Sequence, residues 1–239
     1  MKLQKRLWKL IQPYIWILIL FGLIYVFLQY NNEGFENSYS QIGQDLAVLE
    51  YYNNKEGGYF VEVGAADGIE LSNTYLLETK YKWKGICVEP IPEQYEKLVA
   101  NRPNSKCSND AVYYKGGLIL DFDIANNGIL LSGITENIDA HKKLVDENKR
   151  TINVKTITLT DLLDHYDAPN FIEYLSLDTE GSEYEILKEF DFDKYKFGLI
   201  DVEHNYKEPR RSQIRELLLS KGYEYIRENE FDDCYKYVK

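Results

Sequence analysis

One short segment limits the fold of this chain more than any other: an apolar strand that runs directly into a glycine-containing turn. Tyr59–Val63 is predicted to form a buried strand, Gly64 and Gly68 fall in the turn after it, and a helix is expected near Leu71–Tyr81. Glycine permits a tight turn and the close approach of backbone or ligand. This order of elements indicates an α/β sheet whose ligand lies at the carboxyl ends of the strands.

Strand-like and helix-like segments continue to alternate over the rest of the chain. The alternation predicts an α/β doubly wound sheet. Further strands are expected at Gly85–Glu89, Lys106–Tyr114, Ile172–Leu177 and Lys196–Val202, a β-excursion from Leu118–Ile124, helices at Pro92–Asn101, Gly181–Phe190 and Pro209–Lys221, and a terminal antiparallel pair at Tyr223–Arg227 and Cys234–Val238.

The N-terminal region carries a different signal, a long apolar stretch. Leu10–Leu28 is 19 residues without a charge, which as a helix spans roughly 28 Å, close to the hydrocarbon thickness of a bilayer. The stretch is long for a signal peptide and no A-x-A-like cleavage site follows it, so a membrane anchor is favoured over a signal peptide or a core helix. We therefore expect a basic tail over residues 1–9, a transmembrane anchor over 10–30, a tether over 31–39 and a folded domain over 40–239.

The charges around the anchor predict its orientation. Four basic residues precede it, whereas Glu33 and Glu36 follow it. Basic residues stay on the cytosolic side, so the N-terminus is predicted to be cytosolic and the domain lumenal or extracytoplasmic. The lipid bilayer is thus one expected partner.

The composition of the remaining chain excludes a general nucleic-acid partner. The whole chain carries −11 and residues 1–35 carry +3, so the remainder carries −14. Such a domain repels phosphate backbones. Its three cysteines, Cys87, Cys107 and Cys234, lack paired spacing, which argues against a structural zinc site.

Acidic residues flank the predicted ligand site and point to a cationic ligand. Glu89 closes the second strand 21 residues beyond Gly68, where nucleotide-binding folds place the acid that accepts both ribose hydroxyls. Glu62 precedes the glycine turn and Asp67 lies inside it, and such acids would repel a pyrophosphate. S-adenosylmethionine (SAM) fits better, because it has a sulfonium, an ammonium and a ribose diol but no phosphate.

Two more acids end predicted strands. Asp110, after the third strand, is placed to accept from an adenine amino group, and Asp178, after the fourth, to face the reacting methyl group. Both also suit an ordinary turn or helix cap.

Several short motifs occur together in one order. They are Gln41–Asp45, Phe60–Gly68, Leu71–Thr74, Trp83–Gly85, Val88–Pro90, Leu131–Ile134 and Leu177–Glu183. From about Ser40 to the C-terminus the chain resembles the FkbM-type methyltransferase family. Its opening motif is most similar to a membrane-tethered branch that includes insect Star-like proteins.

The resemblance implies a Rossmann-like fold with a seven-stranded, mostly parallel sheet whose last strand is antiparallel. It also implies SAM as cofactor and O-methylation of a hydroxyl on a sugar, a glycan or another small molecule. Glu62, Gly64, Asp67 and Gly68 then fall on the cofactor loop, Glu89 on the ribose and Asp110 on the adenine. One departure is Ala66, where many methyltransferases have glycine.

Methylation of a hydroxyl requires alignment of the two reactants and removal of one proton. The candidate bases are Glu180, Glu203 and His204, from their predicted positions at strand ends. Leu131–Arg150, with His141, is a candidate substrate lid. A divalent metal held by Asp178 and neighbouring acids, as in some other O-methyltransferases, is an alternative, but the sequence shows no convincing ligand set and no metal ligand is assigned.

The alternative interpretation is a non-catalytic, membrane-anchored adaptor or trafficking protein that retains the fold and binds another protein. A lumenal domain favours it, because SAM is made in the cytosol. The four acids Glu62, Asp67, Glu89 and Asp178 favour an enzyme. A nicotinamide-dependent enzyme is disfavoured, because the chain lacks G-x-G-x-x-G.

Overall fold

The structure is a computed structural model and describes residues 38–238. The predicted basic tail, transmembrane anchor and nearly all of the tether lie outside the described residues. Within residues 38–238, no helix is both long enough and apolar enough to cross a bilayer.

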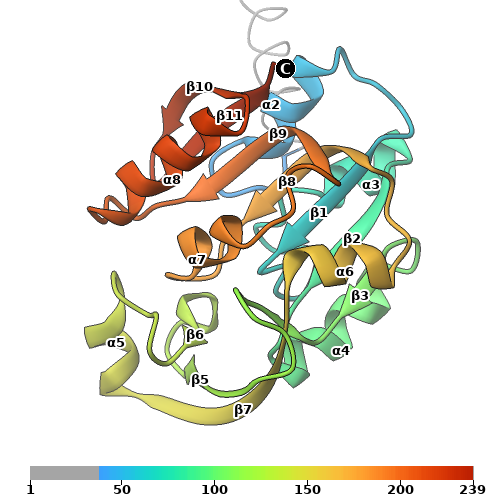
Figure 1. Cartoon of the computed structure of the whole chain (residues 1–239). Coiled ribbons are helices and arrows are strands. Elements are labelled where there is room, and N and C mark those ends of the chain that lie inside the picture. Colours follow the sequence, from blue (N-terminus) through green and yellow to red (C-terminus); the bar gives the residue numbers. More distant parts are fainter. Residues whose placement is uncertain (1–37, 239) are drawn as a thin grey trace, which may run out of the picture. The chain divides into compact units, whose positions relative to one another are not determined.

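A seven-stranded sheet forms the centre of the domain (Figure 1). Its strand order is β10-β11-β9-β8-β1-β2-β3, and only β11 runs against the other six. The predicted sheet, with the last strand of the chain antiparallel, is therefore confirmed. The strands are β1 (Tyr59–Val63), β2 (Lys84–Val88), β3 (Lys106–Ser108), β8 (Phe171–Leu177), β9 (Lys196–Glu203), β10 (Tyr223–Asn229) and β11 (Asp232–Tyr237).

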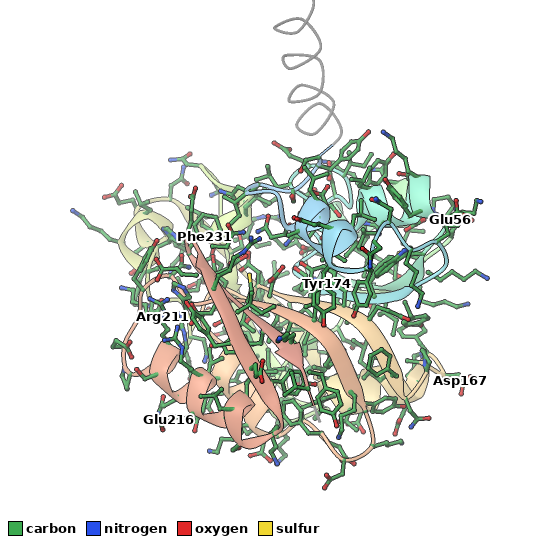
Figure 2. The ribbon with its side chains drawn as sticks, turned by 90° about the horizontal axis from the view of Figure 1, so that it is seen from above. Glu56, Asp167, Tyr174, Arg211, Glu216 and Phe231 are labelled. Carbon is green, nitrogen blue, oxygen red and sulfur yellow. The ribbon has the colours of Figure 1, made fainter. Side chains whose placement is uncertain are left out.

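Helices cover both faces of this sheet because its strands are apolar on both sides. In β1, Phe60 packs with α2 (Gln44–Tyr51), α3 (Tyr75–Tyr81) and α4 (Pro92–Asn101). Its neighbours Val61 and Val63 pack on the other face with α6 (Leu159–His165), α7 (Glu183–Lys188) and α8 (Arg210–Ser220). Alternation of side chains along a strand requires this division. Figure 2 shows Tyr174 of β8 in the interior and Glu56 and Glu216 at the periphery.

A second, four-stranded sheet contains the β-excursion that the sequence predicted from Leu118–Ile124. Its order is β4-β7-β5-β6, and it has a small core of its own that includes Phe122, Ile124 and Val154. Its elements are β4 (Ala111–Val112), β5 (Ile119–Ala125), the 3₁₀ turn η1 (Ile129–Leu131), β6 (Gly133–Ile134), α5 (Lys142–Glu147) and β7 (Lys149–Ile157).

Two sequence-based boundaries were wrong. The single strand expected over Lys106–Tyr114 is divided between β3 of the large sheet and β4 of the small one. The helix expected from Leu71 begins only at Tyr75, because Gly68 and Leu71 adopt left-handed backbone angles that no helix contains. The sequence reasoning also missed α2, α6 and β7.

The turn after β1 brings the ends of two central strands together. Gly64 has φ +88°, and a Cβ added there would lie 2.2 Å from the carbonyl oxygen of Asp178. Its N–H donates to the Val88 carbonyl at 3.0 Å. Glycine is thus required at position 64 both by its backbone angle and by the approach of β8.

Candidate functional site

A pocket lies at the carboxyl ends of the central strands, where the second sheet forms its opposite wall. Its polar side includes Gln44, Asn73, Glu89, Asp178, Glu180, Asp201 and Asp232, and its apolar side includes Ala111, Val112, Phe122, Ile129, Leu130 and Ile134. Seven carboxylic acids line it, and among the described residues no lysine, arginine or histidine does. A ligand with phosphate groups would be repelled here, whereas a cation would be attracted.

Glu62 lines the pocket, but its carboxylate is engaged with the protein. It accepts from Ser72 Oγ at 3.0 Å, the Asn73 N–H at 2.7 Å and Thr74 Oγ1 at 2.6 Å, and Arg102 Nη1 lies 3.3 Å away. These contacts fix the loop between the glycine turn and α3. Glu62 therefore shapes the pocket wall rather than presenting free acceptors.

Arg102, at the end of α4, is buried with 1% of its surface exposed. Its Nε donates to Glu78 at 2.6 Å, and its Nη1 donates to the Gly68 carbonyl at 3.1 Å. Sequence reasoning missed this residue, because its partners lie 24 to 40 positions away. Arg102 connects the glycine turn, the loop after it and α3.

Glu89 presents its carboxylate to the pocket from the end of β2. One oxygen accepts from the Ala66 N–H at 3.0 Å and the other from the Ile91 N–H at 2.8 Å. Burial raises the pKa of Glu89 to about 7 against these two hydrogen bonds, and the nearby Asp178 adds to the rise. Because the pKa is higher than in an exposed glutamate, ionisation of Glu89 destabilises the empty fold as pH rises through 7.

Three other predicted cofactor residues do not line the pocket. Asp67 accepts from the N–H groups of Ile69 and Glu70, both at 2.9 Å, and so stabilises its own turn. A Cβ at Gly68 would lie 2.7 Å from Arg102 Cγ, so this glycine serves packing. Asp110 is half-buried and pairs with Ser108, although the next residue along does line the pocket.

Ala66 shows how the chain departs from the usual glycine. Its φ is +46°, a left-handed angle that costs alanine about 1 kcal/mol relative to glycine. The Ala66 N–H nevertheless donates to Glu89. The turn therefore keeps the shape that positions Glu89, at a small cost in stability.

Asp178 and Glu180 follow β8 and both line the pocket. Burial, followed by repulsion from Glu183, raises the pKa of Asp178 to about 6. Burial, followed by repulsion from Asp178 and Glu183, raises that of Glu180 to about 9. Glu180 has a left-handed φ of +58°, and His141 Nε2, from the start of α5, lies 4.0 Å from its Oε2. The predicted lid segment, through His141, therefore lies next to the buried carboxylate of Glu180.

The other two predicted bases lie outside the pocket lining. Glu203, at the end of β9, is buried beside Asp178, and burial raises its pKa well above the usual value. His204 is also buried, with its Nδ1 accepting from the Tyr206 N–H at 2.9 Å and its Nε2 3.4 Å from Asp233. Both ring nitrogens of His204 therefore face protein groups, and of the three predicted bases only Glu180 lines the pocket.

Several polar pocket residues were not predicted. Gln44 Nε2 donates to Asp232 at 2.9 Å, and the Tyr174 hydroxyl donates to Asp201 at 2.8 Å. Burial raises the pKa of Asp232 to about 8. The opening motif had marked Gln44, but nothing in the sequence showed that α2 and β11 lie together.

The strand order, the glycine turn and the acid after β2 together define a Rossmann-like methyltransferase domain. Residues 62–225 match the family described as the methyltransferase FkbM domain. Since this match covers more than half of the chain, the protein belongs to the FkbM family of SAM-dependent methyltransferases, which implies SAM as the cofactor. The match supports the predicted family but not its membrane-tethered branch. No curated protein matches the chain.

Solved methyltransferase structures are similar at low sequence identity. A precorrin-6y C5,15-methyltransferase from Geobacter metallireducens has 11% identity and a TM-score of 0.41, with 80% of this chain and 86% of that one covered. A methyltransferase from Pyrococcus furiosus has 14% identity and a TM-score of 0.40, with coverage of 80% and 78%. A Methanococcus jannaschii fibrillarin has 12% identity and a TM-score of 0.42, with coverage of 77% and 67%. At these scores the likenesses add no weight to the family match.

The pocket residues fit SAM. The pocket acids other than Glu62 suit its two positive groups, the paired oxygens of Glu89 suit its ribose diol, and the apolar wall of Ala111, Val112 and Phe122 suits a flat adenine ring. The backbone N–H groups of Ala66 and Ile91 fix the orientation of Glu89. These are the groups that would hold the cofactor.

We predict that Arg102→Met lowers the free energy of unfolding by about 3–5 kcal/mol, because it leaves Glu62 and Glu78 buried without a cation. Urea denaturation of the full-length chain in detergent, followed by circular dichroism, measures the change. Lys82→Met is the matched control, since Lys82 forms an exposed pair with Glu56, and its effect is expected to stay below about 1 kcal/mol. Equal losses in the two variants would contradict the prediction.

Proposed function

We propose that the protein transfers a methyl group from SAM to a hydroxyl of an uncharged acceptor, such as a sugar or glycan. The observation that carries the proposal is the pocket, which is lined by seven acids and, within residues 38–238, by no basic side chain. Acceptors with phosphate or carboxylate groups would be repelled by the same acids. A neutral polyol or another neutral alcohol has a hydroxyl that can receive the methyl group and has no negative charge for these acids to repel.

SAM supplies an electrophilic methyl group, and the remaining work falls to residues of the chain. Glu89 would accept hydrogen bonds from the two ribose hydroxyls of SAM, while Asp178 and its neighbours would stabilise its positive charge. Alignment of the acceptor hydroxyl with the methyl group supplies much of the rate. The second sheet covers the pocket and excludes water from this step.

Glu180 is the proposed general base. It lines the pocket, whereas Glu203 and His204 do not. Its carboxylate, ionised once the positive charge of SAM lowers its raised pKa, would take the proton of the acceptor hydroxyl, and His141 Nε2 lies 4.0 Å from it. The left-handed backbone at Glu180 is the kind of local strain found at functional positions.

We expect the affinity for SAM to rise with pH as Glu89 ionises, approaching tenfold per pH unit below about pH 7. The physical reason is that only the ionised carboxylate accepts from both ribose hydroxyls and attracts the cation. Calorimetric titration of the full-length chain in detergent between pH 5.5 and 8.5 measures it.

Glu89→Gln should bind SAM more weakly at pH 8 and lose most of the pH dependence. Glu70→Gln is the matched control, because Glu70 is an exposed acid at the same pocket, and it should retain both. If the wild-type chain is folded but binds neither SAM nor S-adenosylhomocysteine at any pH, the adaptor function becomes the better explanation.

Methyl-labelled SAM and a panel of neutral sugars, sugar phosphates and apolar alcohols test the reaction itself. We expect incorporation only into uncharged acceptors. Glu180→Gln should lower turnover by about 100-fold or more while S-adenosylhomocysteine still binds. His204→Ala should reduce stability and leave the turnover of folded molecules nearly unchanged. Full turnover by Glu180→Gln would exclude Glu180 as the base.

We also propose that residues 10–30 anchor the protein in a membrane, with a cytosolic N-terminus and a lumenal or extracytoplasmic domain, as in the membrane-tethered branch. The uncharged apolar stretch with basic residues before it supports this placement. In sealed vesicles with the cytosolic face outward, a C-terminal tag should resist protease until detergent is added. Cleavage of the tag without detergent would show that the domain lies on the cytosolic side and would contradict the proposed orientation. Under the alternative adaptor function, a protein partner would bind the domain on this side of the membrane.

A further inference from the structure

We propose that Asp178, Glu183 and Glu203 form a binding site for a divalent cation of the magnesium, manganese or calcium class. The site lies at the carboxyl ends of β8 and β9 and at the start of α7. It goes beyond the proposed methyl transfer and does not depend on it.

The topology of the sheet brings the three acids together. β8 and β9 are parallel neighbours in which Leu177 pairs with Val202, so the next residues, Asp178 and Glu203, are adjacent. Glu183 reaches them as the first residue of α7. One carboxylate oxygen from each acid lies within 4.8 Å of the other two. Oxygens bound to one such ion at 2.0–2.6 Å are separated by at most roughly 5 Å, so this spacing suits coordination.

Two carboxylate oxygens in this cluster are buried and lack a hydrogen-bond donor. They are Glu183 Oε2 and Glu203 Oε2, on side chains that are 0% and 6% exposed. The other oxygen of Glu183 accepts from the Thr179 N–H, Thr179 Oγ1 and the Gly181 N–H at 2.8, 2.8 and 3.1 Å. These three bonds fix the carboxylate and leave Oε2 with no hydrogen bond, only the Nε of Arg210 at 3.5 Å. A buried carboxylate oxygen without a partner is costly, and a cation would remove that cost.

The charges around the cluster leave room for an added cation. The nearest basic group is Arg210, whose Nε lies 3.5 Å from Glu183 Oε2. Its Nη1 is already bound to Asp139 at 2.6 Å and to the Gly181 carbonyl at 3.1 Å. One shared guanidinium does not balance three buried acids and the neighbouring Glu180.

A second acidic cluster provides the contrast. His204, Glu228 and Asp233 also gather their ligand atoms, but Arg211 and Arg215 pair with Asp233 at 2.6 and 2.7 Å. Those guanidinium groups and His204 lower the pKa of Asp233 despite its burial. This cluster is already neutralised by the protein and has no need of a metal ion.

The ligand chemistry selects the class of ion. Three carboxylates are hard oxygen ligands, which magnesium, manganese and calcium prefer, whereas zinc sites usually include histidine or cysteine. Asp178 also lines the pocket, so the bound ion would lie at the pocket wall. Its remaining coordination positions would be filled by water or by an oxygen of the acceptor.

Manganese alone tests the site, by electron paramagnetic resonance of free Mn²⁺ titrated into the full-length chain in detergent. We expect one bound ion per chain. Glu203→Gln should weaken binding by at least about tenfold, because it removes one ligand. The matched control, Glu228→Gln, removes an acid from the contrasting cluster and should bind as the wild-type chain does. Neither SAM nor methyl transfer enters the readout, so failure of this site and failure of the proposed function are distinguishable.

Circular dichroism and cooperative thermal unfolding verify that each variant is folded. If Glu203→Gln does not fold, Asp178→Asn takes its place with the same expected loss. Absence of Mn²⁺ binding by the folded wild-type chain at millimolar concentration would overturn the proposal. So would a loss of binding in Glu228→Gln that Glu203→Gln does not share.

Discussion

The ion pair between Arg102 and two buried acids is the contact on which the geometry of the pocket depends. Its guanidinium holds Glu78 of α3, Glu62 of β1 and the backbone of the glycine turn at once. Removal of one partner from such a network is far more costly than loss of an exposed pair. The loop that it fixes includes Ser72 and Asn73, which line the pocket. A buried cation outside the pocket thus positions a wall to which the described part of the chain contributes no cation.

Burial is the strongest influence on the ionisation of the acids that line the pocket. The pKa values of Glu89, Asp178, Glu180 and Asp232 are all raised, with burial as the largest cause. Each of these groups gains when a positive charge enters. The empty pocket therefore favours the protonated, neutral forms of these acids and a bound cation favours the ionised forms, which makes the free energy of binding depend on pH.

The fold and the position of Gly64, Glu89 and Asp178 at the pocket were predictable from the sequence, because both depend on local patterns. The bounds of β1 and α4 were predicted correctly, and Gly64 and Glu89 follow strands whose ends are visible in the sequence. The contributions of Arg102, Asp201 and Asp232 were not predictable, since they depend on contacts between distant segments. Asp67 was predicted to face the cofactor but does not line the pocket. An aspartate in a glycine turn accepts hydrogen bonds from its own backbone as readily as it faces a ligand, and Asp67 does the former. His204 stands at a strand end, as predicted, but its imidazole contacts Asp233 and not the pocket.

The two walls of the pocket are encoded by separate stretches of the chain. Residues near the ends of β1, β2 and β8 form one wall, and the small sheet with its own core forms the other. Substitutions in the small sheet can therefore change which molecule is accepted without disturbing the central strands. The division gives the domain a modular design, in which exchange of residues 118–157 between relatives would reshape one wall of the pocket, Phe122 included, while the strands of the central sheet stay the same.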